Sequence, residues 1–341
     1  MLNVLVTGAG GGVGQGIIKS LNLIDDIAIN LITADMSELA AGHYFGNKAF
    51  IVSACTSKKY TLELIKIFKR EKIDFYFPGT DVELIYCAQN KNFFKEKYNV
   101  HTVISSLETI MISNDKYKTA NFLKKNNLSY PDTIFANQAI IEDLKFPLIL
   151  KPAIGHGSIG VFKINNKEEL KKHNLEDPNY VIQELIGAEN EEFTCTIVKS
   201  NENFSLVLPL QRELRSGDTY RANPIKSNKI EKYVQAIAEK LDIDGGCNFQ
   251  LRLDSQGNPK VFEINSRFSG TTPFCAQLGF NPVEFYIKSF LNINYAPKVN
   301  YDLQVLRYWR EILVHKDSVK KLKKEKQANE LYVKQIKLFR E

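Results

Sequence analysis

Residues 261–267 read Val-Phe-Glu-Ile-Asn-Ser-Arg, which places an acid, an amide and an arginine at every second position. Side chains two residues apart on a β-strand lie on the same face. Glu263, Asn265 and Arg267 are therefore expected to share one face of a strand whose other residues are mostly apolar. The polar outer face of an ordinary hairpin would explain any one of these residues, but it explains the set at strict period two poorly.

A partner strand is predicted just upstream. Asn248–Leu253 alternates polar and apolar residues, with Gln250 and Arg252 on one face, and a turn at residues 254–259 joins it to the first strand. An antiparallel hairpin would then present Gln250, Glu263 and Asn265 together. Carboxylate and amide oxygens, completed by phosphate oxygens and water, are what Mg²⁺ prefers. Arg267 beside them can clamp a phosphoryl group with two hydrogen bonds.

An earlier apolar strand ends in a lysine and runs into glycines. Phe146–Lys151 is followed, after Pro152, by Gly155-His156-Gly157-Ser158-Ile159-Gly160. A small glycine loop between two strands can lie over a polyphosphate and donate its backbone N–H groups. Lys151 would then reach the phosphates as a point charge. A lysine at a strand end is usually just solvated, so Lys151 alone means little.

The next apolar segment, Val181–Gly187, breaks at a glycine and suits a hinge whose backbone pairs with a purine edge. Two acids, Glu191 and Glu192, follow it, and a carboxylate there can accept both hydroxyls of a ribose. By itself this pattern would fit any acidic turn.

The N-terminus carries a glycine-rich turn, Thr7–Gly14, between a predicted strand and a predicted helix. Such a turn offers helix N-terminal N–H groups to an anion, and Asp35, about 20 residues on, can hold a ribose hydroxyl. It resembles the short-chain dehydrogenase fingerprint, so an NAD(P)-binding oxidoreductase is an alternative. The tyrosine–lysine pair which that resemblance implies occurs only at Tyr44 and Lys48, too early for a catalytic helix. A turn kept for packing or for a small anionic substrate is the competing interpretation.

Strand and helix patterns alternate over the first 110 residues, which predicts a parallel sheet covered on both faces. A helix over Asp115–Lys125, capped by Ser113 or Asn114, follows. Short strands then dominate and predict an antiparallel α+β region. They are expected at Leu148–Lys151, Ser158–Lys163, Tyr180–Gln183, Phe193–Val198 and Phe204–Leu208.

Composition is that of a globular enzyme, with 44% hydrophobic and 25% charged residues in 341. Five scattered cysteines without a Cys-x-x-Cys pair argue against disulfides and a zinc site and fit a cytoplasmic protein. No apolar run approaches the roughly 20 residues of a membrane span. The net charge of +6 comes partly from lysines after residue 316, which favours a solvated helix face over nucleic-acid binding.

In this order and spacing, the segments resemble the ATP-grasp superfamily, especially its carbamoyl-phosphate-synthase-like single-chain ligases. The match covers roughly residues 1–315, including the glycine-rich turn, the loop Phe77–Leu84 and the late segment Arg307–Arg310. The resemblance implies a Rossmann-like pre-ATP-grasp domain with a parallel sheet, followed by two α+β subdomains that clasp ATP. The expected domains are residues 1–110, a lid subdomain at 111–188, a catalytic subdomain at 189–315 and a Lys-rich C-terminal helix at 316–341.

The resemblance also implies roles for the matched positions. Lys116 and Lys151 would bind the ATP phosphates beneath the mobile loop of Gly155, His156, Gly157 and Ser158, while Glu184 and Ile186 would contact adenine and Glu192 would bind the ribose. Gln250, Glu263 and Asn265 would hold one or two Mg²⁺ ions, with Mn²⁺ as a substitute. Arg267 and Lys151 would be catalytic. Many family members carry an acid where this chain has Gln250, so the site has less negative charge.

The implied activity is an ATP-dependent carboxylate–amine ligase that works through an acyl phosphate on small-molecule substrates, without nucleic acid or membrane partners. A non-catalytic ATP-binding protein is the other alternative. Arg212, Arg215 and Arg221 are either grips for an anionic substrate or parts of a solvated loop. Oligomeric state stays open, since the apolar tail residues that would cover a partner subunit are irregularly spaced. These are Val319, Leu322, Leu331 and Ile336.

Overall fold

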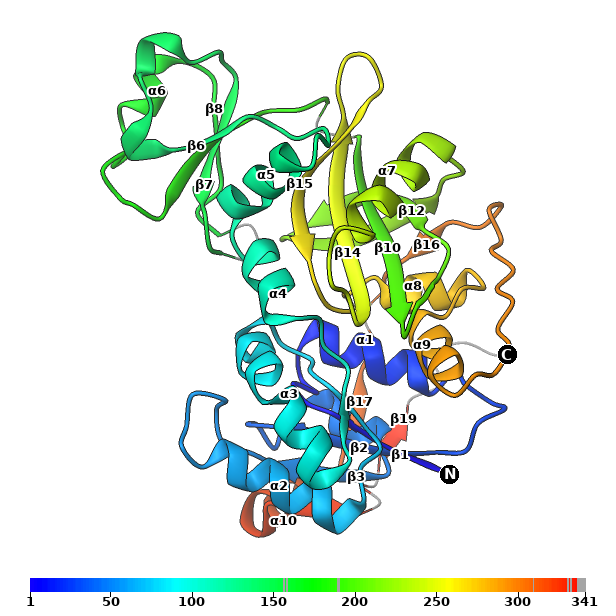
Figure 1. Cartoon of the computed structure of the whole chain (residues 1–341). Coiled ribbons are helices and arrows are strands. Elements are labelled where there is room, and N and C mark those ends of the chain that lie inside the picture. The colour runs from blue at the N-terminus through cyan, green and yellow to red at the C-terminus, as the bar shows by residue number, and fades with distance from the viewer. Residues whose placement is uncertain are drawn as a thin grey trace.

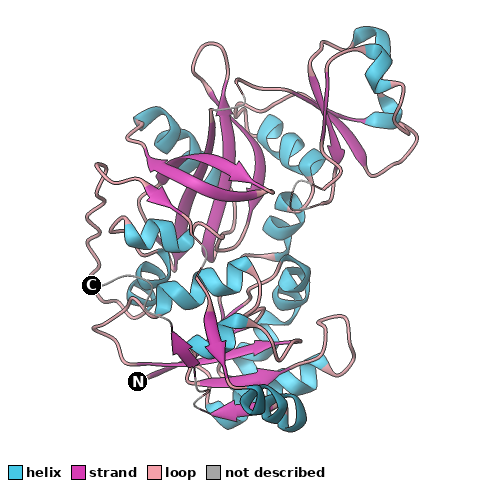
Figure 2. Ribbon diagram, turned by 180° about the vertical axis from the view of Figure 1, so that it is seen from behind, coloured by secondary structure: helices cyan, strands magenta, loops and turns pink. Residues whose placement is uncertain are grey.

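The computed structural model describes residues 1–155, 157, 159–188, 191–308, 310–329, 331 and 333–335. The described residues form three larger sheets with their helices and one two-stranded sheet (Figures 1 and 2). A small four-stranded sheet stands at one end, a larger antiparallel sheet lies in the middle, and an α/β body built from the first hundred residues lies at the other end. Across the described part of the chain, every helix falls short of the length and apolar character that a membrane span requires.

The N-terminal body is built on a six-stranded sheet in the order β18-β3-β2-β1-β4-β5. Strands β1 to β5 pair in parallel, as predicted. Both faces of the sheet are buried, because successive residues of β1 point into two different hydrophobic clusters. The elements are β1 (Leu2–Val6), α1 (Gly12–Leu21), β2 (Ile29–Asp35), β3 (Lys48–Ile51), α2 (Tyr60–Glu71), β4 (Phe75–Phe77), α3 (Leu84–Tyr98) and β5 (His101–Thr102).

The small sheet has the order β6-β9-β7-β8 and is antiparallel. Its elements and the two preceding helices are α4 (Leu107–Ser113), α5 (Lys116–Lys125), β6 (Thr133–Phe135), β7 (Leu148–Pro152), β8 (Phe162–Ile164), α6 (Lys167–Leu170) and β9 (Tyr180–Glu184). Two local predictions are wrong here. The strand expected from residue 158 begins only at Phe162, and the cap of α5 is Asp115, whose carboxylate accepts from two N–H groups of the first turn.

The large sheet runs β15-β14-β10-β12-β13-β16, with β11 paired to β10. Its elements are β10 (Glu192–Ser200), β11 (Asn203–Phe204), β12 (Leu208–Arg215), β13 (Asp218–Pro224), α7 (Asn228–Ala238), β14 (Gly245–Leu253), β15 (Pro259–Asn265), α8 (Thr272–Gln277), α9 (Pro282–Phe290) and β16 (Val305–Leu306). The strand expected at 204–208 does not exist as one element, because β11 ends at Phe204 and β12 begins at Leu208.

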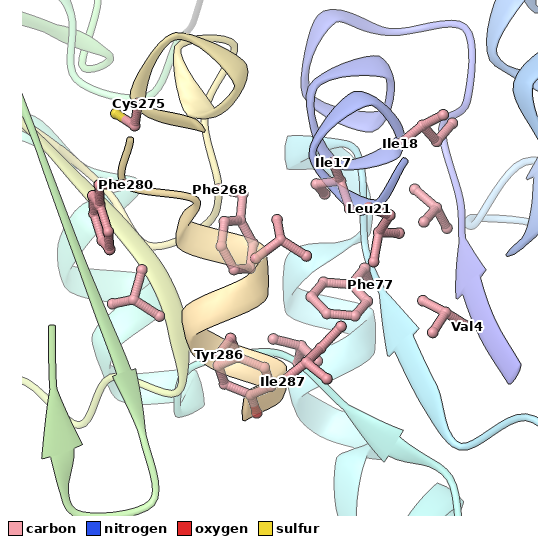
Figure 3. Packing of buried hydrophobic residues seen from close by; sticks show 14 of the residues in the cluster. Val4, Ile17, Ile18, Leu21, Phe77, Phe268, Cys275, Phe280, Tyr286 and Ile287 are labelled. Atoms are coloured by element: carbon pink, nitrogen blue, oxygen red, sulfur yellow. The ribbon is translucent and has the colours of Figure 1, made fainter. Parts of the chain in front are cut away.

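One hydrophobic core joins the N-terminal body to the large sheet. Figure 3 shows Ile17, Leu21 and Phe77 of the N-terminal body facing Phe268 and Tyr286 of the C-terminal half. Phe77 and Tyr286 are fully buried, and their ring centroids lie 6.0 Å apart. The carboxyl ends of β1 and β4 are thereby held in a fixed position relative to the large sheet.

The C-terminal segment is not one helix. α10 (Lys316–Glu325) ends at a left-handed Lys326, and β18 (Gln327–Asn329) then adds antiparallel to β3. A separate two-stranded antiparallel sheet pairs β17 (Ile312–Val314), which precedes α10, with β19 (Val333–Gln335). Leu322 is fully buried within its own chain, so it does not cover a partner subunit; Ile336 lies outside the described residues.

Candidate active site

A cleft of about 230 Å³ lies between the small and the large sheet. It gathers residues that are far apart in the sequence, from α5, β7, β9, β10, β12, β14 and β15. Most of the predicted site residues line it. They are Lys116, Lys151, Gly155, Gly157, Glu184, Ile186, Glu192, Gln250 and Glu263.

Lys151 is the most buried cation of this cleft, with only 5% of the residue exposed. It lies near the end of β7, and its ammonium donates to the side-chain oxygen of Gln183 at 2.7 Å. The ammonium also lies 5.4 Å from the ring centroid of Phe262. Burial, opposed by Glu263 and assisted by Lys116, lowers the pKa of Lys151 to about 8. The cleft thus holds a desolvated cation that an anionic ligand would stabilise.

Lys116 fastens the start of the glycine loop, Gly155–Gly160. Its ammonium donates to the carbonyl of Gly155 at 2.7 Å, and its backbone N–H donates to Ala153. Gly157 and Gly160 have positive φ, a region that glycine adopts freely. Two residues predicted to bind the nucleotide, His156 and Ser158, lie outside the described residues.

The predicted hairpin forms, and it contains a β-bulge. Gln250 pairs with Glu263 whereas Leu251 pairs with Val261, so Phe262 is an extra residue in β15. Bulges re-aim side chains and are common beside active sites. Here both Phe262 and Glu263 line the cleft. From the sequence alone, Phe262 was only one of the apolar residues of this strand.

The oxygen donors expected for Mg²⁺ lie close together. Glu263 and Gln250 line the cleft, and the amide of Asn265 donates to Glu263 at 3.0 Å. Among the described residues, no group of three or more His, Cys, Asp or Glu side chains is placed to hold a metal ion. The predicted set has one carboxylate and two amides, and it fits a divalent ion that takes its remaining oxygens from phosphates and water.

Arg267 lies beside this set rather than in the cleft lining. Its guanidinium donates to both carboxylate oxygens of Asp81, at 2.5 and 3.0 Å, and to Asn265 at 3.3 Å. A continuous chain of contacts therefore runs from Glu263 through Asn265 and Arg267 to the N-terminal body. Sequence reasoning missed Asp81, although it lies in the Phe77–Leu84 loop that had been singled out.

Glu192 faces the cleft, whereas its neighbour Glu191 is exposed. Its carboxylate accepts from Arg212, with the closer nitrogen at 2.5 Å, and from Arg252 at 2.9 Å. Four N–H groups occupy the roughly four acceptor positions of a carboxylate. The ribose role of Glu192 stays a prediction, and it requires one arginine to release a bond.

The arginines proposed as a substrate grip have separate partners. Arg212 is buried in the pair with Glu192, so it is neither in a solvated loop nor free for a substrate. Arg221 forms an exposed pair with Glu213 at 3.3 Å, and Arg215 packs over the Tyr220 ring. Arg221 packs over the same Tyr220 ring as Arg215, each 5.3 Å from its centroid, whereas Arg212 is held separately by Glu192.

The hinge residues line the cleft as expected. The backbone N–H of Glu184 donates to Asp132, and its carboxylate contacts Lys260 at 3.1 Å. The carbonyl of Ile186 accepts from Arg252 at 3.5 Å. Because the Glu184 N–H is already used, a purine would have to contact the Glu184 carbonyl and the backbone of Ile186, which lies beyond the end of β9.

The N-terminal glycine-rich turn is packed against its neighbours. A Cβ on Gly14 would lie 2.1 Å from the carbonyl oxygen of Gly8, and one on Gly79 would lie 2.1 Å from that of Thr7. The carboxylate of Asp35 accepts from the backbone N–H groups of Gly10 and Ser37. Close packing accounts for glycine at these positions without a nicotinamide cofactor.

Two models of known protein families match this chain. Residues 113–271 match the model of the ATP-grasp domain, and residues 4–104 match that of a PylC-like N-terminal domain. The two matches cover the sheets that form the cleft and the N-terminal parallel sheet.

Individual proteins agree at low identity. An uncharacterised protein of Mycoplasma pneumoniae is 27% identical over 47% of this chain and 58% of its own length. The mitochondrial arginine-specific carbamoyl phosphate synthase large chain of Neurospora crassa is 24% identical over 83% of this chain but only 26% of its own length. N5-carboxyaminoimidazole synthetase of Staphylococcus aureus, solved with ADP, superposes with a TM-score of 0.70 at 18% identity, covering 87% of this chain and 80% of that one. The chain thus spans 58% of the length of the Mycoplasma pneumoniae relative and about a quarter of that of the carbamoyl phosphate synthase chain, and the structural likeness confirms the fold.

Proposed function

Because this chain belongs to the ATP-grasp superfamily, we propose that it is an ATP-dependent ligase that activates a carboxylate as an acyl phosphate and passes it to an amine. One observation carries the proposal. The desolvated cation Lys151, the acid Glu263 and the amide Gln250 line the same cleft. Each comes from a different strand, so the set is assembled only by the fold.

Nucleotide binding would use the two sides of the cleft differently. Backbone groups at Glu184 and Ile186 would contact the purine, and Glu192 would accept a ribose hydroxyl after one of its arginines shifts. The ammonium groups of Lys116 and Lys151 would hold the phosphates, and the backbone N–H groups of the glycine loop would cover the phosphates. Lys151 gains most from this, because phosphate oxygens replace the water that it lost on burial.

Gln250, Glu263 and Asn265 would hold Mg²⁺, which would neutralise charge that develops on the transferring phosphoryl group. Arg267 would stabilise the same group from the other side, with its guanidinium held by Asp81.

The reaction then needs positioning more than covalent chemistry from the protein. A substrate carboxylate oxygen attacks the γ-phosphorus in line, the bond to the β–γ bridging oxygen breaks, and ADP leaves. The amine nitrogen next attacks the acyl carbon, inorganic phosphate leaves with the C–O bond electrons, and the nitrogen loses a proton. Closure of the glycine loop would keep water from the acyl phosphate in between.

The test measures ADP release against a panel of carboxylate and amine pairs. Glu263→Gln is the matched control, because it keeps the side-chain size but removes the single carboxylate of the metal set. At least one pair should raise ADP release in the wild type and not in the variant. If the wild type binds Mg·ATP and no pair exceeds the control, the protein is a non-catalytic ATP-binding protein instead.

Ligand-induced stabilisation separates the oxidoreductase alternative. A ligand at 100 times its Kd stabilises the folded state by about 2.7 kcal/mol. Mg·ATP should therefore raise the melting temperature measurably, and NADPH should not. A shift with NADPH alone would reverse the assignment and return attention to the Thr7–Gly14 turn.

A further inference from the structure

The guanidinium of Arg267 is held by a residue of the N-terminal body, Asp81. Asp81 lies 186 positions earlier, yet both of its carboxylate oxygens accept from Arg267, at 2.5 and 3.0 Å. Only 14% of the Arg267 side chain is exposed. The third guanidinium nitrogen, Nη1, donates to the carbonyl of Phe268 at 3.0 Å, and Nη2, which also donates to Asp81, donates to Asn265 at 3.3 Å. Such a fork-to-carboxylate pair fixes the plane of the guanidinium as well as its place.

Asp81 is itself held firmly. It follows β4 in a short turn closed by a capping box between Thr80 and Glu83. The buried Glu83 carboxylate accepts from Gly79, Thr80 and Thr7, all within 3.0 Å. It also accepts from Tyr60 and Tyr76, at 2.8 and 3.0 Å. The turn that carries Asp81 is thus tied to the carboxyl end of the parallel sheet.

We infer that Asp81 is a positioning residue for phosphoryl transfer: it orients Arg267 from the N-terminal body and makes that body part of the catalytic apparatus. The inference rests on the proposed function, in which Arg267 contacts the transferring phosphoryl group. Asp81 is not among the described residues that line the nucleotide cleft. Its effect should therefore appear in the transition state and not in the binding of nucleotide.

The probe is MgADP, with and without aluminium fluoride, which mimics a phosphoryl group in transfer. The quantity compared is the fluoride gain, defined as the factor by which fluoride lowers the Kd of MgADP. In Asp81→Asn the Kd of MgADP alone should stay unchanged, while the gain should fall by up to about a hundredfold, which is what a misplacement of about an ångström can cost. Arg267→Lys should show a loss of similar size, and the double variant should lose little more.

A matched control breaks another ion pair between the same two parts of the molecule. Lys91 of α3 contacts Asp244, just before β14, at 2.7 Å. Lys91→Met should lower the melting temperature but leave the fluoride gain intact. Asp81→Glu keeps the charge and displaces the carboxylate by one methylene, so it preserves the test if Asp81→Asn folds poorly; its gain should also fall.

The outcomes separate the inference from the proposed function. If Arg267→Lys loses the gain while both Asp81 variants keep it, Asp81 does not position Arg267, and the ligase proposal stands. If Arg267→Lys keeps the gain, the proposed role of Arg267 is wrong and the role of Asp81 falls with it. If Lys91→Met loses as much of the fluoride gain as Asp81→Asn does, the contact between Asp81 and Arg267 only stabilises the interface, and the inference is wrong.

Discussion

Raising the pH should deprotonate one buried lysine well before the surface lysines, because burial lowers the pKa of Lys151 to about 8. In the unfolded chain a lysine titrates near about 10.4. Between these two values the unfolded chain binds more protons, so this group makes stability rise with pH. At about 1.36 kcal/mol per pKa unit, the rise is up to about 3 kcal/mol, and it is absent below pH 8.

Nucleotide affinity should move in the opposite direction. Phosphate oxygens favour the ammonium form, so the pKa of Lys151 rises when ATP binds. The Kd of Mg·ATP should be constant below pH 8 and should then increase up to about tenfold per pH unit, until the pKa of the bound state is reached. Calorimetric titrations at pH 7, 8, 9 and 9.5 would measure this slope.

Lys151→Met is the matched variant, because methionine approximates the stem of lysine and carries no proton. Its Kd should be larger at pH 7 and should change less between pH 8 and 9.5, and its urea stability should not rise over that range relative to the wild type. Comparing the two proteins removes every group that titrates in both. Parallel slopes in wild type and variant would refute the assignment of the titration to Lys151.

Three further predictions concern other parts of the site and the fold. Glu192→Gln removes the buried carboxylate that pairs with Arg212 and should lower the free energy of unfolding in urea by about 3–5 kcal/mol. If Glu192 also binds the ribose, the variant should lose the wild-type preference for ATP over 2′-deoxy-ATP, and an unchanged preference would exclude that role. Glu263→Gln should raise the Mg²⁺ concentration needed for ATP binding about tenfold, measured by Mg²⁺ titration at fixed ATP, and an unaltered midpoint would remove Glu263 from the metal set. Leu322→Ala should weaken docking of the C-terminal segment by about 2–5 kcal/mol and speed tryptic cleavage there; equal cleavage rates would contradict the buried contact.

The period-two pattern was enough to predict the hairpin and its polar face, because side-chain alternation is a local property of strands. It could not predict the bulge at Phe262, since a bulge is set by the register with Gln250 and Leu251. An apolar residue at an alternating position gives no sign that it is the extra one. Only the structure therefore shows that Phe262 is the aromatic neighbour of Lys151.

Partners distant in the sequence were beyond such reasoning. Glu192 meets Arg212 and Arg252 across 20 and 60 residues, and Arg267 meets Asp81 across 186. No local pattern encodes these pairs, because each depends on how separate sheets pack. The same holds for β18, whose short polar sequence pairs with β3 and completes the N-terminal sheet.

The charges of the cleft explain why an amide at position 250 suits a nucleotide. Of the described residues that line it, four are cationic and three are acidic: Lys116, Lys151, Arg212 and Arg252 against Glu184, Glu192 and Glu263. The excess is small, and Lys116 helps to lower the pKa of Lys151. A glutamate in place of Gln250 would cancel the excess and would favour a bare cation over a bound polyphosphate. With glutamine there, the metal oxygens depend on the phosphates of the nucleotide, so metal and ATP are expected to bind together. A metal ion that binds without ATP would have an incomplete oxygen shell and would leave the Lys151 ammonium desolvated. The coupling between metal and ATP binding therefore follows from the residues of the cleft.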